Sequence, residues 1–365
     1  KVKGIGQMAP RTRRGMMKKL DADTPAVLVD LDIAERNIQK FQQYCDAKGF
    51  AVRPHIKTHK LPRLAQFQIQ AGAIGITCQK ISEAEAMISK GGISDVLITY
   101  NIIGSEKVER LAALAKKITL SVVADNVTVV QGLAEGFKNA QKPLPVLVEC
   151  DTGAGRCGVQ SPSEAAALAK KINAMLGLEF AGLMTYPPAA RPNDVLAWLS
   201  EAKSMIEESG LRVGIISSGG SPDMWNAHHM PLATEYRIGT YIYNDRLLLE
   251  HGVCKQVDCA LTVLATVVSV PTAHRAIIDA GSKVLTSDLL GLDGHGLVVG
   301  RPDLIIDQLS EEHGRLETQQ PIAMEVGQKI QIIPNHVCVV SNMVDSVVVT
   351  RGDEIVGIEA VVARG

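Results

Sequence analysis

Short apolar runs alternate with amphipathic segments over the first two thirds of the chain. The first run, 26–30, is followed by residues that share one face of a helix: Ala34, Ile38, Phe41 and Cys45. Further strands are expected at 51–56, 75–78, 96–100, 120–124, 146–150, 180–185, 214–217 and 240–243. Helical segments separate most of these runs, so the pattern is that of repeated β-α units.

Two helix starts carry the sequence pattern of a capping box. Asp32 with Glu35 predicts the start of the first helix, and Ser82 with Glu85 predicts the start of a later one. The second of these helices is expected to end at Gly91-Gly92, because glycine readily adopts the left-handed conformation that closes a helix.

The number and spacing of these units predict the fold class, α/β with a (β/α)8 TIM-type barrel over residues 24–250. β-rich stretches at 261–270, 275–279, 329–333 and 346–349 predict a C-terminal mostly-β domain, assigned to residues 1–23 and 251–365. An open doubly wound sheet is the alternative, but no G-x-G-x-x-G turn follows the first strand.

Composition narrows the class of function. The net charge is −1 and 4% of residues are aromatic, which argues against binding to nucleic acid or to a membrane surface. The seven cysteines include no C-x-x-C pair, no secretory segment leads the chain, and no apolar run reaches about 18 residues. These features predict a protein of the reducing cytoplasm.

Polar and glycine-rich segments follow the predicted strands, where a barrel places its active site. The segment 53–60 is dense in basic groups around Lys57. A desolvated lysine among cations has a lowered pKa and forms imines readily, although a solvated basic turn has the same composition. The turn at 217–221 could hold a phosphate on its backbone N–H groups, or it could be purely structural.

A second candidate site lies in the β-rich domain. His336 and Cys338 are two residues apart, so on a strand both side chains would point to one face. Imidazole and thiolate together suit Zn²⁺. The alternative is a buried cysteine beside an ordinary histidine.

Taken together, these segments resemble the D-threonine aldolase and D-serine dehydratase family of fold-type III pyridoxal-phosphate (PLP) enzymes, whose barrel is shared with alanine racemase. The resemblance extends over nearly the whole chain. It is carried by residues 23–25, 53–60, 78–80, 149–158, 239–241, 278–281, 312–314, 334–338 and 363–365.

The resemblance implies roles for residues around the cofactor. Lys57 would carry PLP as a Schiff base, and His59 would accept the proton of the substrate hydroxyl. Arg156 would lie near the phenolic oxygen of PLP with Gln79 close by, and Tyr186 would line the ring or the substrate. The phosphate would be held by Ser218, Gly219, Gly220, Gly239 and Thr240.

A divalent metal is also implied, Mn²⁺ or Zn²⁺ with Mg²⁺ as a third choice, held by His336 and Cys338 and binding the substrate hydroxyl. Two positions depart from the pattern of D-threonine aldolases. Cys338 stands where they have Asp, and it resembles the zinc-bound D-serine dehydratases. Arg237 stands where many relatives have Gln, as in alanine racemase, where an arginine faces the pyridine nitrogen.

The resemblance favours an aldolase that cleaves small D-β-hydroxy-α-amino acids to glycine and an aldehyde. A D-serine or D-threo-3-hydroxyaspartate dehydratase, giving a keto acid and ammonia, uses the same residues. A non-catalytic PLP carrier with this barrel is the third reading, but such carriers lack a C-terminal β domain. The family also leads us to expect a homodimer.

Overall fold

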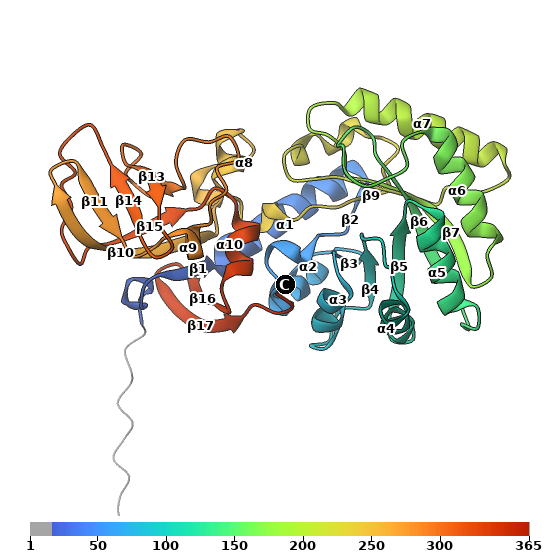
Figure 1. Cartoon of the computed structure of the whole chain (residues 1–365), viewed down its shortest axis with the longest axis horizontal. Helices are drawn as coiled ribbons and strands as arrows, with labels where there is room; N and C mark the ends of the chain where they lie inside the picture. Colours follow the sequence, from blue (N-terminus) through green and yellow to red (C-terminus); the bar gives the residue numbers. More distant parts are fainter. Residues whose placement is uncertain (1–16, 365) are drawn as a thin grey trace, which may run out of the picture.

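In the computed structural model of the chain, which describes residues 17–364, eight parallel strands form one of two sheets (Figure 1). The strands are β2 (Ala51–Val52), β3 (Ile76–Cys78), β4 (Asp95–Ile98), β5 (Thr119–Ala124), β6 (Leu144–Cys150), β7 (Leu178–Thr185), β8 (Ile215–Ser218) and β9 (Glu235–Tyr236). The helices of this part are α1 (Leu31–Lys48), α2 (Pro62–Gln70), α3 (Ile81–Ile88), α4 (Ser105–Ala115), α5 (Val127–Phe137), α6 (Pro162–Ala174), α7 (Pro192–Glu208) and α8 (Arg246–Glu250).

The parallel sheet closes into a barrel. Its order is β2-β9-β8-β7-β6-β5-β4-β3. The two ends of this order are joined by backbone hydrogen bonds, from Ile74 N to Val52 O at 3.0 Å and from Thr77 N to Pro54 O at 2.7 Å. The TIM-type barrel predicted from the sequence is therefore confirmed.

A nine-stranded sheet forms the second lobe, and it is antiparallel apart from one pair, β1 with β16. Its strands are β1 (Ala26–Asp30), β10 (Leu261–Thr272), β11 (Arg275–Ile278), β12 (Leu297–Val298), β13 (Ile305–Leu309), β14 (Gly314–Glu317), β15 (Lys329–Ile333), β16 (Ser346–Arg351) and β17 (Glu354–Ala360). Two helices accompany it, α9 (Ser282–Leu285) and α10 (Val337–Met343). This confirms the C-terminal β-rich domain. The exact domain boundaries stay a prediction, and residues 1–16 and 365 lie outside the described part.

The strand expected to open the barrel belongs to the second sheet. β1 pairs antiparallel with β10 and parallel with β16. Its central residues Val27, Leu28 and Val29 are all buried. A strand buried on both faces has a continuous apolar run, as barrel strands do, so the pattern alone cannot say which sheet it joins.

The last barrel strand was also predicted in the wrong place. Residues 240–243 form a 3₁₀ helix over Thr240–Ile242, and the strand lies earlier, at β9. β9 is two residues long and contains the buried Glu235, so it gives no apolar signal. Tyr241 and Tyr243 are buried in the core instead, which explains why their segment resembled a strand.

Both predicted capping boxes are displaced. The carboxylate of Asp30, not Asp32, accepts hydrogen bonds from the first turn of α1. At α3, Glu83 accepts hydrogen bonds from Gln79 N at 2.6 Å and Lys80 N at 3.3 Å, so the helix begins two residues earlier than expected. The helical face predicted for α1 is correct, because its apolar residues are buried: Ala34, Ile38, Phe41 and Cys45.

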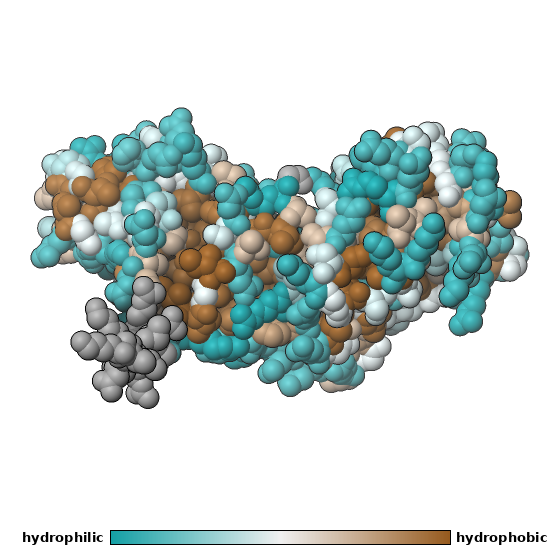
Figure 2. Space-filling model, turned by 90° about the horizontal axis from the view of Figure 1, so that it is seen from below, coloured by the Kyte–Doolittle hydropathy of each residue, from teal (hydrophilic) through white to brown (hydrophobic). Residues whose placement is uncertain are grey.

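The described residues include no candidate membrane span, and they expose apolar side chains at one edge of the second sheet. Among the residues that the structure describes, no helix combines the length and the apolar character needed to cross a bilayer. Strand β17 forms one edge of the second sheet, and its Val356 and Ile358 are 47% and 71% exposed. Figure 2 shows apolar surface on this half of the molecule.

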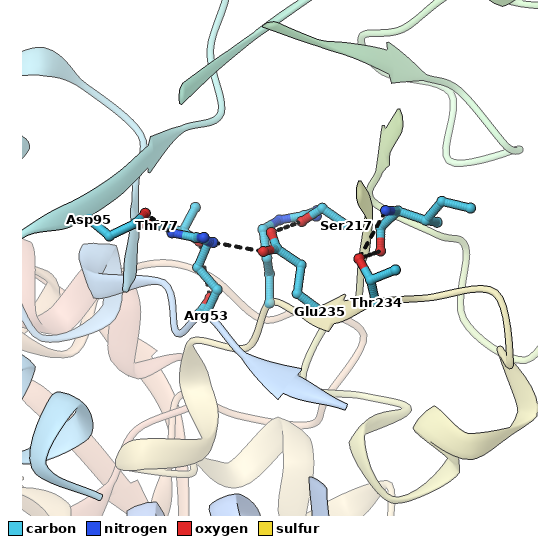
Figure 3. A network of polar contacts seen from close by, with 8 residues as sticks. Arg53, Thr77, Asp95, Ser217, Thr234 and Glu235 are labelled. Carbon is cyan, nitrogen blue, oxygen red and sulfur yellow. Dashed lines mark hydrogen bonds and ion pairs between the residues drawn. The ribbon is translucent and has the colours of Figure 1, made fainter. Parts of the chain in front are cut away.

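A buried ion-pair network ties the two shortest strands into the barrel (Figure 3). Arg53, directly after β2, donates from Nε to Glu235 of β9 at 2.9 Å and also forms an ion pair with Asp95 of β4. Ser217 of β8 donates to the second oxygen of Glu235 at 2.6 Å. The side chains of Arg53 and Glu235 are 7% and 4% exposed, so the pair is held away from water.

We predict that Glu235→Ala lowers the free energy of unfolding by about 3 kcal/mol, because removing one partner leaves buried charge on Arg53 poorly compensated. Urea titration followed by circular dichroism measures this. Glu179→Ala, an exposed glutamate of β7, is the control and should change stability by less than about 0.5 kcal/mol. Equal stabilities of the two variants would show that the network does not support the barrel.

Candidate active site

An open cavity of about 1020 Å³, counting space continuous with solvent, lies where the carboxyl ends of the barrel strands meet the second lobe. It contains most of the residues that the sequence indicated. From the barrel and its loops it is lined by Lys57, Gln79, Arg156, Tyr186, Gly219, Gly220, Arg237, Gly239 and Thr240, and from the second lobe by His336 and Cys338. Ser218 and His59, also predicted, do not line it.

Lys57 lies in a 3₁₀ turn, Ile56–Thr58, that follows β2. Its side chain reaches into the cavity, where the surrounding protein removes part of the water shell. Desolvation lowers the pKa of Lys57, the nearby Cys338 opposes this shift, and the positive charges of Arg156 and Arg237 add to it. A larger fraction of Lys57 is therefore the neutral amine, which is the nucleophilic form.

His55 forms the wall next to Lys57 and was missed by the sequence reading. Its Nδ1 accepts a hydrogen bond from Lys57 N at 3.3 Å, so its proton sits on Nε2, which donates to Gln79 Oε1 at 3.2 Å. Gln79 Nε2 in turn donates to Thr99 O at 3.0 Å. Burial, then the charge of Lys57, lower the pKa of His55 well below its usual range, so the ring is neutral.

Two arginines give the cavity its positive charge. Arg237 is buried and is fixed by hydrogen bonds to Ser217 Oγ at 2.8 Å and to Thr185 O at 2.7 Å. Burial lowers the pKa of Arg237 to about 10, which leaves it charged at neutral pH. The guanidinium of Arg156 stacks over the ring of Tyr186, 4.8 Å from the ring centroid.

Glycines let the backbone approach the cavity closely. Gly219 has φ +125°, and a Cβ there would lie 2.7 Å from the ring of Tyr236. At Gly239 a Cβ would lie 2.8 Å from Thr58 Oγ1. Within residues 17–364, no acceptor receives the N–H groups of Gly219, Gly220, Gly239 or Thr240. All four residues line the cavity, and free backbone N–H groups in such a place can hold a phosphate.

His336 and Cys338 enter the cavity from the start of α10. The sequence pattern predicts a strand at this place, and that prediction is wrong. His336 is the residue before the helix, and Cys338 lies in its first turn. The strand ends earlier, at Ile333, so the two side chains do not share a strand face as predicted, although both line the cavity. Cys338 Sγ lies 3.2 Å from Thr58 Oγ1 and 3.6 Å from Thr240 Oγ1.

Asp245 orients this pair and was not found from the sequence. Its fully buried carboxylate lies 2.9 Å from His336 Nδ1, which leaves Nε2 for a ligand. Burial alone would lower the pKa of His336, but the bonds to Asp245 and Cys338 raise it to about 10. Burial would raise the pKa of Cys338, but the bond to His336 and the charge of His336 lower it below the ordinary value for a thiol.

The donor set around this pair fits a metal with open positions. In the described part of the chain, no group of three or more His, Cys, Asp and Glu side chains could hold a metal ion. Two protein ligands would leave the other positions to water or substrate, with one protein ligand fewer than catalytic zinc sites usually have.

His59 lies outside the cavity, contrary to the role predicted for it. It is fully buried, with Nε2 3.3 Å from Gln68 Oε1 and Nδ1 accepting from Leu61 N at 3.0 Å. Burial lowers its pKa to about 4. Both ring nitrogens are engaged inside the protein, so this placement does not support His59 as the base for a substrate hydroxyl.

Comparison with known proteins places these features in a family. The alanine racemase N-terminal domain matches residues 29–246, and a putative serine dehydratase domain matches residues 260–350. The chain is 31% identical to a D-threonine aldolase of Arthrobacter sp. over 94% of this chain and 93% of that protein. It is 32% identical to a 3-hydroxy-D-aspartate aldolase of Paracoccus denitrificans over 96% and 94%.

Solved structures agree. The D-threonine aldolase from Filomicrobium marinum superimposes with a TM-score of 0.86 at 32% identity, over 97% of this chain and 99% of that one. A D-threo-3-hydroxyaspartate dehydratase, solved as a Cys→Ala mutant in the metal-free form, gives 0.85 at 26% identity over 96% and 100%. The same named enzyme has been solved with a His→Ala substitution two positions earlier. The chain therefore belongs to the family of D-threonine aldolases and D-serine dehydratases built on the alanine-racemase barrel.

Proposed function

We propose that this protein is a PLP- and divalent-metal-dependent D-threonine aldolase, which cleaves D-β-hydroxy-α-amino acids to glycine and an aldehyde. The observation that carries the proposal is that Lys57 and the His336–Cys338 pair line one cavity. An amine that can bind a cofactor covalently and a metal-ligand pair are thus available to the same small molecule.

The residues of the barrel fit PLP. Lys57 would bind it covalently, and the free N–H groups around Gly219 and Gly239 would hold its phosphate. Arg237 has no carboxylate among its hydrogen-bond partners, so it presents positive charge to the cavity. Such a cation beside the pyridine nitrogen would disfavour protonation of that nitrogen.

The residues around α10 fit a divalent metal, with Mn²⁺ or Zn²⁺ and then Mg²⁺ as candidates. In the D-threo-3-hydroxyaspartate dehydratase, the cysteine replaced in the metal-free mutant structure lies two positions after the histidine replaced in another mutant. His336 and Cys338 have the same spacing. When bound, PLP would withdraw electrons from the bond broken at Cα, and the metal would lower the pKa of the β-hydroxyl.

Other side chains hold these groups in place. Asp245 fixes the ring of His336, and the hydroxyls of Thr58 and Thr240 contact Cys338 Sγ. His55 lines the cavity, but both of its nitrogens are bonded, so we assign it to positioning Gln79. We also propose a homodimer, because apolar side chains such as Tyr100 and Ile103 are 51% and 62% exposed. We propose a cytoplasmic location because all seven cysteines are free thiols, as in proteins of a reducing compartment.

A dehydratase acting on D-serine or D-threo-3-hydroxyaspartate is the second candidate. Cys338 favours it, because the dehydratase relative also has a cysteine at its substituted position. In that reaction Lys57 would remove the α-proton and hydroxide would leave from Cβ. The two reactions differ in which bond of Cα breaks.

Incubation of the PLP-loaded protein with D-threonine separates the two reactions. With Mn²⁺ or Zn²⁺ present we expect glycine and acetaldehyde in equal amounts, detected by chromatography, and loss of product on treatment with EDTA. Formation of 2-oxobutyrate and ammonia would establish the dehydratase instead. Absence of turnover on every D-β-hydroxy-α-amino acid would contradict both.

Replacement of Lys57 tests the attachment of the cofactor. We expect Lys57→Ala to lose the absorbance band near about 410–430 nm that a lysine–PLP adduct gives, because no other amine lines the cavity in the described residues. Lys90→Ala, an exposed lysine, should keep the band. A borohydride-reducible adduct that survives in Lys57→Ala would show that another lysine carries PLP.

Replacement of Asp245 tests the orientation of His336. Asp245→Asn should weaken metal binding by about 10–100-fold, because the amide no longer fixes the ring as a charged acceptor. Calorimetric titration with Zn²⁺ measures this, with the surface variant Asp303→Asn as the control. Unchanged affinity in Asp245→Asn would remove His336 from the metal site as described.

A further inference from the structure

One wall of the cavity is apolar. Leu247, Leu248 and Leu290 line it on the side of the second lobe, next to His336. The cations that line the cavity, Lys57, Arg156 and Arg237, all come from the barrel side, which also carries Met184 and Pro222. The cavity therefore has a cationic half and an aliphatic half.

The aliphatic half is fixed relative to His336. Leu248 N donates to Asp245 Oδ1 at 3.0 Å, and the other oxygen of this carboxylate holds His336. Leu247 N donates to the carbonyl of Asn335, the residue before His336, at 3.3 Å. A substrate whose β-hydroxyl binds the metal at His336 would thus have its Cβ substituent next to these leucines.

Leu290 is held at the cavity edge by its loop. The Asn335 side chain donates to the carbonyls of Asp288 at 3.0 Å and Gly294 at 2.9 Å, which brackets the loop. Leu290 has φ +53°, a left-handed conformation that is unfavourable for leucine, and it remains 45% exposed. A leucine held in a strained backbone conformation at the edge of a cavity is a candidate functional position.

The cationic residue next to Leu247 in the sequence, Arg246, does not line this wall. Arg246 is turned into the loop, where Nη1 donates to Gly294 O at 3.3 Å and Gly296 O at 3.2 Å, and it does not line the cavity. Its Nε lies 3.5 Å from Glu250. Among the described residues, no lysine or arginine after Arg237 in the chain lines the cavity, so the second lobe supplies neither to pair with a carboxylate on Cβ.

We propose that Leu290, with Leu247 and Leu248, selects substrates whose Cβ substituent is an alkyl or aryl group and rejects those with a carboxylate there. This inference rests on the proposed function and specifies its substrate class. A carboxylate against three leucines loses water without gaining a partner, whereas an apolar group gains burial. The chain would then differ in substrate from its 3-hydroxy-D-aspartate aldolase relatives.

Steady-state kinetics test the preference. For the PLP- and metal-loaded protein, kcat/KM should be at least about tenfold higher for D-threonine and D-phenylserine than for D-3-hydroxyaspartate. Leu290→Arg places a cation on the apolar wall and should shift this ratio toward hydroxyaspartate by about tenfold or more. Leu289→Arg adds the same charge one residue away, at a position that is 44% exposed and outside the cavity, and should leave the ratio unchanged.

Binding of unreactive analogues separates failure of this inference from failure of the proposed function. D-Norvaline and D-aspartate lack the β-hydroxyl, so their affinities can be measured by calorimetry whether or not the protein is an aldolase. Tighter binding of D-norvaline, reversed in Leu290→Arg and not in Leu289→Arg, supports the inference. Equal or tighter binding of D-aspartate to the unmodified protein, or equal shifts in the two arginine variants, overturns it. Thermal unfolding of both variants checks that they are folded.

Discussion

The hydrogen bond between Asp245 and His336 is the interaction on which the site depends. Asp245 begins α8, just after the barrel, while His336 precedes α10 in the second lobe. Because this carboxylate also accepts the N–H groups of Leu248 and Val337, a single buried group aligns both lobes at the cavity. His336 and Cys338 are therefore held in the same cavity as Lys57 by the junction of the lobes, and neither lobe would form the site alone.

The cavity separates two kinds of chemistry by charge and burial. Its barrel side is cationic and glycine-lined, which suits a phosphorylated cofactor and its electron-withdrawing ring. Its other side offers an imidazole, a thiol and aliphatic side chains, which suit a metal and the substituent of a substrate. The reaction would take place where the two halves meet, above Lys57.

Much of this arrangement could be read from the sequence, and the failures have identifiable causes. Barrel strands with apolar runs were located closely, whereas β9 was missed because its buried Glu235 depends on Arg53, 182 residues earlier in the chain. The sequence pattern places β1 in the wrong sheet, because a strand with a fully buried centre has the same continuous apolar run in either sheet. Asp245 could not be found, because its link to His336 spans 91 residues with no local pattern.

His59 shows how closeness in sequence misleads. It follows Lys57 by two residues, but the segment forms a 3₁₀ turn, in which residues three apart share a face and residues two apart do not. Lys57 therefore reaches the cavity while His59 packs against Gln68. The residue types at 336 and 338 were the better signal, because both side chains line the cavity even though the expected strand is a helix start.

The central claim is that a covalently bound cofactor and a metal share this cavity. The most direct measurement is a crystal structure of the protein grown with PLP and Zn²⁺, with anomalous data collected at the zinc absorption edge. The account predicts density continuous with Lys57 Nζ, together with an anomalous peak within about 2.0–2.3 Å of His336 Nε2 and Cys338 Sγ. A cofactor attached elsewhere, or a peak away from both side chains, would contradict it.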